Sequence, residues 1–159
     1  MRISIAVNGE VISAEVSAGE TLLELLRRLG FKSVKQACET GNCGACTVLM
    51  DGRPVASCIM LAAQADGSSL RTVEGLGVAG RLHPVQEAFI AAGAPQCGFC
   101  TPGMIMTAVA FLESNPDPTR DAVREALSGN LCRCSGYVKV VDAVMDAAER
   151  MREKDGHHG

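Results

Sequence analysis

Eight cysteines, spaced in two groups of four, constrain this chain more than any other feature of its sequence. The groups are Cys38, Cys43, Cys46 and Cys58 in the first half, and Cys97, Cys100, Cys132 and Cys134 in the second. One iron–sulfur cluster needs four thiolates, and the first group begins with the C-x4-C-x2-C spacing of plant-type [2Fe-2S] proteins. Its fourth cysteine follows after eleven residues, a shorter gap than is usual in that class. The spacing therefore predicts two metal centres in one chain.

Zinc is the alternative occupant of either group, because four thiolates also satisfy a tetrahedral zinc ion. Zinc ligands usually arrive as two C-x2-C pairs, whereas the first group contains only one such pair. Its loop, CETGNCGAC at residues 38–46, also carries Gly41 and Gly44. Glycines there allow backbone N–H groups to turn toward the sulfur atoms of an anionic cluster. The first group thus favours an iron–sulfur cluster, while spacing alone leaves zinc open for the second.

Cys132 and Cys134 are separated by a single arginine in the stretch GNLCRCSGY. A disulfide between them would be strained, because bridged cysteines keep their Cα atoms about 4.4–6.8 Å apart with a χ3 near ±90°. We therefore expect this pair to bind metal together with Cys97 and Cys100. Each pair directly precedes a predicted helix, and helix N-termini favour a bound anion.

The first half of the chain reads as strands joined by tight turns around one helix. Asn-Gly at 8–9 and Asp-Gly at 51–52 are favoured two-residue hairpin turns. A helix is predicted at 21–29, where a Thr-x-x-Glu capping box precedes a run of leucines. The predicted strands are 3–7, 11–16, 47–50, 53–58 and 70–73.

The second half changes to a helical period near residue 82, with apolar residues at i, i+3, i+4 and i+7. Four helices are predicted. The first contains residues 85–92, the second spans 102–114, the third ends before Gly129, and the fourth spans 137–152. His83, before a proline at the first helix start, is expected to be structural. Strands followed by helices indicate an α+β fold.

The predicted domain organisation is a first unit at 1–75 and a second at 81–152. The glycine-rich stretch 74–80 is predicted to link them. The polar segment 153–159 is predicted to be a disordered tail.

Composition excludes several classes of protein. The 159 residues carry a net charge of −3 without a basic patch, and only one Tyr, four Phe and no Trp are available to stack on bases, so nucleic acid is not an expected partner. No apolar run is long enough to span a membrane. Clustered cysteines without an export signal favour a reducing compartment, and we expect the protein in the cytoplasm.

Three strings in the sequence, in this order, resemble the small iron–sulfur subunit of the molybdenum hydroxylases, the family of xanthine dehydrogenase, aldehyde oxidoreductase and carbon monoxide dehydrogenase. The strings are CETGNCGACTV, QCGFCTPGMIM and GNLCRCSGY, and the resemblance covers residues 3 to about 150. It implies a β-grasp, ferredoxin-like [2Fe-2S] domain followed by a four-helix [2Fe-2S]-binding domain. It also implies that all eight cysteines are cluster ligands.

The same resemblance implies two partners and a role. A large subunit would bind molybdopterin next to the cluster of the helical domain, and an FAD-binding medium subunit would lie toward the other cluster. Gln96, directly before Cys97, and Cys134 are the residues that the resemblance places against the pterin. The expected function is electron transfer between molybdenum and flavin, with no bond chemistry in this chain.

Two other functions remain compatible with the residues. One is a free-standing two-cluster ferredoxin, although a net charge of −3 gives little electrostatic steering for a diffusing carrier. The other is a zinc-stabilised interaction module. The substrate of the complex is not encoded here, because the large subunit would select it.

Overall fold

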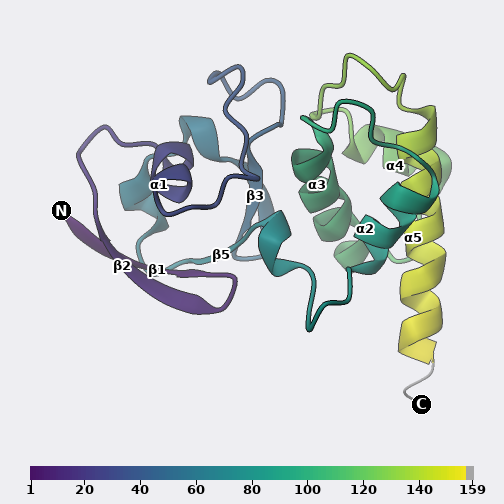
Figure 1. Cartoon of the computed structure of the whole chain (residues 1–159), viewed down its shortest axis with the longest axis horizontal. Helices are drawn as coiled ribbons and strands as arrows, with labels where there is room; N and C mark the ends of the chain where they lie inside the picture. The colour runs from purple at the N-terminus through teal and green to yellow at the C-terminus, as the bar shows by residue number, and fades with distance from the viewer. Residues whose placement is uncertain (157–159) are drawn as a thin grey trace.

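The computed structural model describes residues 1–156, which form two modules lying side by side (Figure 1). The first module contains a five-stranded sheet and helix α1 (Leu22–Arg28). The second module contains α2 (Pro84–Ala91), α3 (Thr101–Ser114), α4 (Arg120–Ala126) and α5 (Val138–Gly156). This is the predicted α+β arrangement, with strands and helices in separate halves of the chain.

The sheet has the strand order β2-β1-β5-β3-β4. The strands are β1 (Arg2–Val7), β2 (Glu10–Glu15), β3 (Thr47–Met50), β4 (Arg53–Ala56) and β5 (Ser69–Arg71). Strands β1 and β5 are parallel, and the other neighbouring pairs are antiparallel. Both predicted hairpin turns are present. The central residues have φ values of 52° and 90° at 8–9 and of 49° and 80° at 51–52, as a turn matching the twist of its strands requires.

Helix α1 begins at the predicted capping box. The Thr21 hydroxyl oxygen accepts the Glu24 N–H at 3.2 Å, and the Glu24 carboxylate accepts the Thr21 N–H at 2.7 Å. Two N–H groups that the helix itself cannot pair are thereby satisfied. The leucines of α1 pack in one core with the inward residues of β1. A helix packed on this sheet makes the module the β-grasp unit that the resemblance implied.

Strand β4 is shorter than the predicted strand at 53–58. It ends at Ala56, and Ser57–Ile59 forms a 3-10 turn instead. The turn places Cys58 in the core, where it is 7% exposed. Nothing in residues 57–58 marks the point where the backbone turns, so the strand was predicted two residues too long.

All four predicted helices of the second module are present, with ends shifted by a few residues. His83 begins α2 as a cap: its Nδ1 accepts the Val85 N–H at 3.2 Å. Burial lowers the pKa of His83, and the neutral imidazole is the form with a nitrogen free to accept. Within residues 1–156, no helix combines the length and apolarity needed to cross a bilayer.

Helix α5 continues beyond its predicted end at residue 152, as far as Gly156. The segment predicted as a disordered tail therefore begins on this helix. Its last three residues, 157–159, lie outside the described residues.

The two modules meet where α3 packs against β3 (Figure 1). Leu49 of β3 is fully buried and belongs to the core of the helical module. Arg71 of β5 pairs with Glu113 of α3 at 2.9 Å. A Cβ atom on Gly103 of α3 would lie 2.2 Å from the carbonyl oxygen of Gly44, so only glycine fits there without a shift of the backbone.

The predicted linker is ordered. Val73–Gly75 forms a 3-10 turn, and Leu76 is buried in the core of the helical module. Val78 and Arg81 then exchange two backbone hydrogen bonds of 3.0 Å across a tight turn. Leu76 therefore anchors the linker to the second module.

Candidate functional site

The first cysteine group lies on the loop between α1 and β3, together with the 3-10 turn after β4. Cys46 and Cys58 are buried, while Cys38 and Cys43 are half-buried. The Cys38 sulfur accepts the N–H groups of Thr40 at 3.5 Å and Cys43 at 3.4 Å. Gly41 and Gly44 have φ values of 77° and 70°, the left-handed conformation predicted for them. The loop therefore directs backbone N–H groups toward sulfur.

The thiols of this group differ in acidity. The Thr40 and Cys43 hydrogen bonds lower the pKa of Cys38 to about 5. Burial, helped by the neighbouring Cys46 thiol, raises the pKa of Cys58 to about 11. Metal binding requires thiolates, so a metal entering this loop meets one sulfur that is already anionic and displaces a proton from another.

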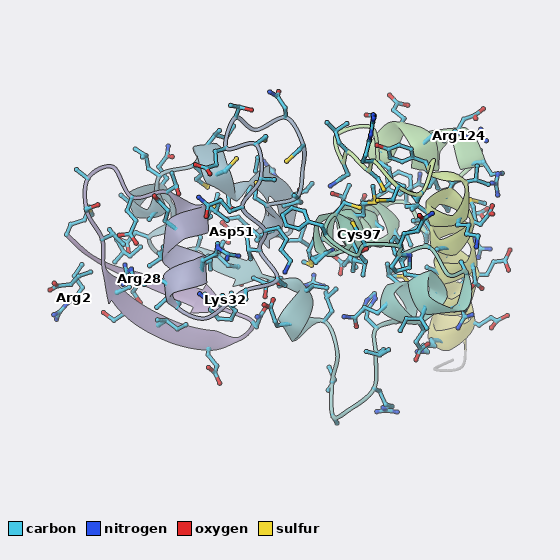
Figure 2. All side chains as sticks on the ribbon, turned by 45° about the horizontal axis from the view of Figure 1, so that its top comes forward. Arg2, Arg28, Lys32, Asp51, Cys97 and Arg124 are labelled. Atoms are coloured by element: carbon cyan, nitrogen blue, oxygen red, sulfur yellow. The ribbon has the colours of Figure 1, made fainter. Side chains whose placement is uncertain are left out.

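The second group joins two loops from different parts of the helical module. Cys97 and Cys100 directly precede α3, and Cys132 and Cys134 lie in the loop before α5. Figure 2 labels Cys97 at the helical module, with further sulfur atoms close to it. One cavity is lined by all four of these cysteines and by Gln96. The structure thus brings together every residue predicted for this site.

Cys132 is the most hydrogen-bonded thiol of the second group. Its sulfur accepts the N–H groups of Cys134 at 3.4 Å and Ser135 at 3.3 Å, and the Ser135 hydroxyl at 3.2 Å. Burial opposes its ionisation, but these donors outweigh burial and lower the pKa of Cys132 to about 7. Burial and the adjacent Cys132 thiol raise the pKa of Cys100 to about 12. As in the first group, an acidic thiol sits beside a protonated one.

The thiols affect one another's acidity in pairs. A neighbouring thiol helps to raise the pKa of Cys58, Cys100 and Cys134, and these neighbours are Cys46, Cys132 and Cys97 respectively. In the part of the chain that the structure describes, no three Cys, His, Asp or Glu side chains converge around a point that would hold a single metal ion. A binuclear cluster takes two thiolates on each iron, and each of the two groups supplies four cysteines.

A backbone bridge connects the two cysteine loops. The Leu131 N–H, directly before Cys132, donates to the carbonyl oxygen of Cys43 at 2.9 Å. The Asn130 side-chain amide donates to the carbonyl oxygen of Gly44 at 3.1 Å, and Asn130 is only 3% exposed. These contacts join residues more than 80 positions apart, and no sequence pattern predicted them.

Gln96, Cys97 and Cys134 are exposed. Phe99 and Leu131, near them in the sequence, are also exposed, at 46% and 55%. The second cysteine group therefore opens to the surface beside large apolar side chains, whereas the first group keeps two of its four cysteines in the core.

Two cysteine groups on a β-grasp module and a four-helix module define a two-cluster iron–sulfur protein, and the comparisons with known proteins agree. Residues 5–72 match a family described as 2Fe-2S iron-sulfur cluster binding domain, and residues 72–145 match one described as [2Fe-2S] binding domain. Together these matches cover both cysteine groups. The chain belongs to the family of small iron–sulfur subunits of the molybdenum hydroxylases.

Relatives with known names resemble the chain along nearly its whole length. The nicotinate dehydrogenase small FeS subunit of Eubacterium barkeri is 51% identical over 93% of this chain and 95% of its own. The nicotine 6-hydroxylase small subunit of Paenarthrobacter nicotinovorans is 52% identical over 98% and 94%. The xanthine dehydrogenase iron-sulfur-binding subunit of Escherichia coli O157:H7 is 47% identical over 91% and 92%.

Solved structures give the same result. A chain of quinoline 2-oxidoreductase from Pseudomonas putida 86 superposes with a TM-score of 0.93, at 47% identity and 96% coverage of both chains. The aldehyde oxidoreductase of Desulfovibrio desulfuricans ATCC 27774 superposes with a TM-score of 0.92 at 45% identity. There the match covers 96% of this chain but only 17% of the longer one.

Proposed function

We propose that this chain relays electrons between a molybdopterin cofactor in a large partner subunit and FAD in a second partner. The named relatives support this role, since they are subunits of nicotinate, nicotine and xanthine oxidoreductases. Within the chain, the proposed units are 1–75 and 81–152. This chain carries electrons and does no bond chemistry itself, and the partner subunit selects the substrate.

The proposed ligands are the eight cysteines. Cys38, Cys43, Cys46 and Cys58 would hold one [2Fe-2S] cluster, and Cys97, Cys100, Cys132 and Cys134 the other. Each cluster, when bound, accepts and releases one electron at a time. The chain's own contribution is to supply thiolates, to turn N–H groups toward sulfur, and to exclude water from the buried side of each loop.

The observation that carries the proposal is the bridge between the loops. The Leu131 N–H donates to the Cys43 carbonyl oxygen at 2.9 Å. Cys43 is a proposed ligand of the first cluster, and Leu131 directly precedes Cys132, a proposed ligand of the second. One hydrogen bond therefore connects the two ligand loops. Electron tunnelling weakens steeply across a gap and less steeply through bonded contacts. A bonded connection between the two loops is what a relay needs and what two independent structural metal sites would not need.

Gln96 and Cys134 are the proposed contacts to the pterin. Both are exposed and line the same cavity as the other ligands of the second group. A partner subunit could therefore reach them without disturbing the core. The exposed Phe99 and Leu131 nearby would provide apolar contact with that partner.

A Gln96→Ala variant of the assembled complex tests this assignment. We expect both clusters and partner binding to be retained, because one neutral hydrogen bond contributes only about 0.5–1.5 kcal/mol net. Reduction of the clusters by substrate should nevertheless be slower, because a bonded contact becomes a gap. Stopped-flow bleaching of the cluster absorbance, after anaerobic mixing with substrate, measures the rate.

Gln64→Ala provides the matched control. Gln64 is an exposed glutamine on the first module, whose side-chain oxygen accepts the Leu61 N–H at 3.0 Å. Its replacement should leave the bleaching rate unchanged. If the cluster absorbance of Gln96→Ala bleached as fast as that of this control, Gln96 would have no part in electron transfer from the pterin. If the chain purified from native extract without large partners, the relay itself would be wrong and a free-standing carrier would take its place.

A further inference from the structure

Tyr137, the only tyrosine in the chain, has a backbone conformation that a bulky residue rarely adopts. Its φ is +68°, and Gly136 before it has a φ of +62°. A non-glycine residue in the left-handed region costs free energy and persists only where the surrounding structure fixes it, often at a functional site.

The phenol group of Tyr137 binds both peptide groups that flank Leu131. Its hydroxyl accepts the Cys132 N–H at 2.8 Å and donates to the Asn130 carbonyl oxygen at 3.1 Å. The two contacts hold the carbonyl oxygen of the 130–131 peptide and the N–H of the 131–132 peptide. A single hydroxyl group therefore binds one side of the segment 130–132.

The opposite side of the same segment faces the first cysteine loop. In a trans peptide the C=O and N–H groups point in opposite directions. Because the Asn130 carbonyl is fixed on Tyr137, the N–H of the same peptide, that of Leu131, points away from Tyr137 and reaches Cys43 at 2.9 Å. The Asn130 side chain adds its bond to Gly44 on that side.

The contact between the loops leaves little room for adjustment. A Cβ on Gly44 would lie 2.4 Å from the Gly129 carbonyl oxygen and 2.6 Å from the Asn130 amide nitrogen. A side chain at position 44 would therefore displace the backbone of Gly129 or the side chain of Asn130.

We infer that Tyr137 is a positioning residue for electron transfer between the two clusters, because its hydroxyl aims the Leu131 N–H at the Cys43 carbonyl. This inference rests on the proposed function. Tyr137 is not one of the proposed ligands. It acts through the peptide that joins the two cysteine loops, and its strained backbone is the cost of placing the hydroxyl there.

Tyr137→Phe in the full chain loaded with both clusters tests the inference, because it removes the hydroxyl and keeps the ring. Each reduced [2Fe-2S] cluster carries one unpaired spin, so the fully reduced chain should show a magnetic interaction between the two spins. We expect Tyr137→Phe to retain the full iron content but to change this interaction. Electron equilibration between the clusters after a reducing pulse should become several-fold slower. Asn130→Ala, which removes the other side-chain contact of the segment, should change both readouts in the same direction.

Ser57→Ala is the matched control. The buried Ser57 hydroxyl donates to the Cys46 carbonyl oxygen at 2.8 Å. Like Tyr137→Phe, this variant removes a hydroxyl group that binds the backbone near a predicted ligand. Unlike Tyr137→Phe, it leaves the contacts of the 130–132 segment intact. It should leave the interaction and the equilibration rate as in the parent chain.

Two results would overturn the inference. If Tyr137→Phe left both the magnetic interaction between the clusters and the rate of electron equilibration unchanged, Tyr137 would have a structural role only. Loss of the second cluster from that variant would make the hydroxyl a requirement for cluster assembly instead. Failure of the proposed function would look different, because the parent chain would then either lack two interacting clusters or purify from native extract without large partners.

Discussion

Individual cysteines show how much a residue pattern reveals. Spacing identified all eight candidate ligands, because the chemistry of an iron–sulfur cluster demands thiolates in sets of four. The residues that connect the two sets, Asn130 and Leu131, had no such signature. Their partners, Gly44 and Cys43, lie more than 80 positions away, and a contact of that kind depends on how two finished modules pack.

The two cysteine groups should be separable by single substitutions. Cys46 lies in the buried core of the first module, and Cys134 is exposed on the second. We expect Cys46→Ser to remove one electron paramagnetic resonance signal of the reduced protein, and Cys134→Ser to perturb a different one. Spectra of the reduced variants at low temperature make the comparison. Should both substitutions alter the same signal, the division into two groups of four would be wrong.

Helices and strands were predictable where local chemistry decides them. The capping box at Thr21 and the Asn-Gly and Asp-Gly turns form as predicted, because these motifs satisfy their own backbone groups. The end of β4 was wrong by two residues, because the turn that buries Cys58 depends on packing. The linker was predicted from its glycines, but the burial of Leu76 in the helical core could not be read from composition.

The 3-10 turn at Val73–Gly75 is attached to the first module by Glu74. The Glu74 carboxylate accepts the Ser33 N–H at 2.9 Å, the Ser33 hydroxyl, and the Thr72 hydroxyl at 2.6 Å. Burial opposes ionisation of Glu74, but these donors outweigh it and hold the pKa of Glu74 below its ordinary value. Glu74 therefore fixes the start of the linker to the first module, and its hydrogen bonds favour the charged carboxylate.

Glu74→Gln should lower the free energy of unfolding at pH 7 by about 1 kcal/mol, allowing for solvent screening of a partly exposed group. Because the pKa of Glu74 is lower in the folded than in the unfolded chain, its contribution is present above the ordinary value of 4.5 and is lost as pH falls through the folded value. Denaturant titrations at pH 7 and at acid pH, with the exposed Glu10→Gln as control, measure the difference. If the difference in free energy of unfolding between the variant and the parent were the same at both pH values, this explanation would be contradicted.

At the scale of the whole molecule, two cysteine groups imply a fixed metal content. We expect the chain purified alone to be brown and to bind about four irons, two for each binuclear cluster. It should turn over no substrate, because the proposed function places the bond chemistry in the large partner subunit. Iron and zinc analysis of native protein, with an assay of the isolated chain, tests both points. Zinc in place of iron would contradict the assignment of two [2Fe-2S] clusters. Substrate turnover by the isolated chain would contradict its proposed role as an electron relay.

The relation between the modules was the part of the fold that the sequence did not predict. The change from strand to helical periodicity located both units, yet nothing in either pattern indicated that α3 covers β3. That packing depends on Gly103 and Gly44, which allow two backbones to approach closely, and on the Arg71–Glu113 ion pair.

Leu49 adds an evolutionary consequence to this packing. It belongs to a strand of the ferredoxin-like module but is buried in the core of the helices. A gene rearrangement that separated the modules would expose this leucine and the α3 surface that covers it, so selection should favour inheritance of the two as one block. The longer aldehyde oxidoreductase chain agrees, because its matching stretch, 17% of that chain, corresponds to 96% of this one and so carries both modules together.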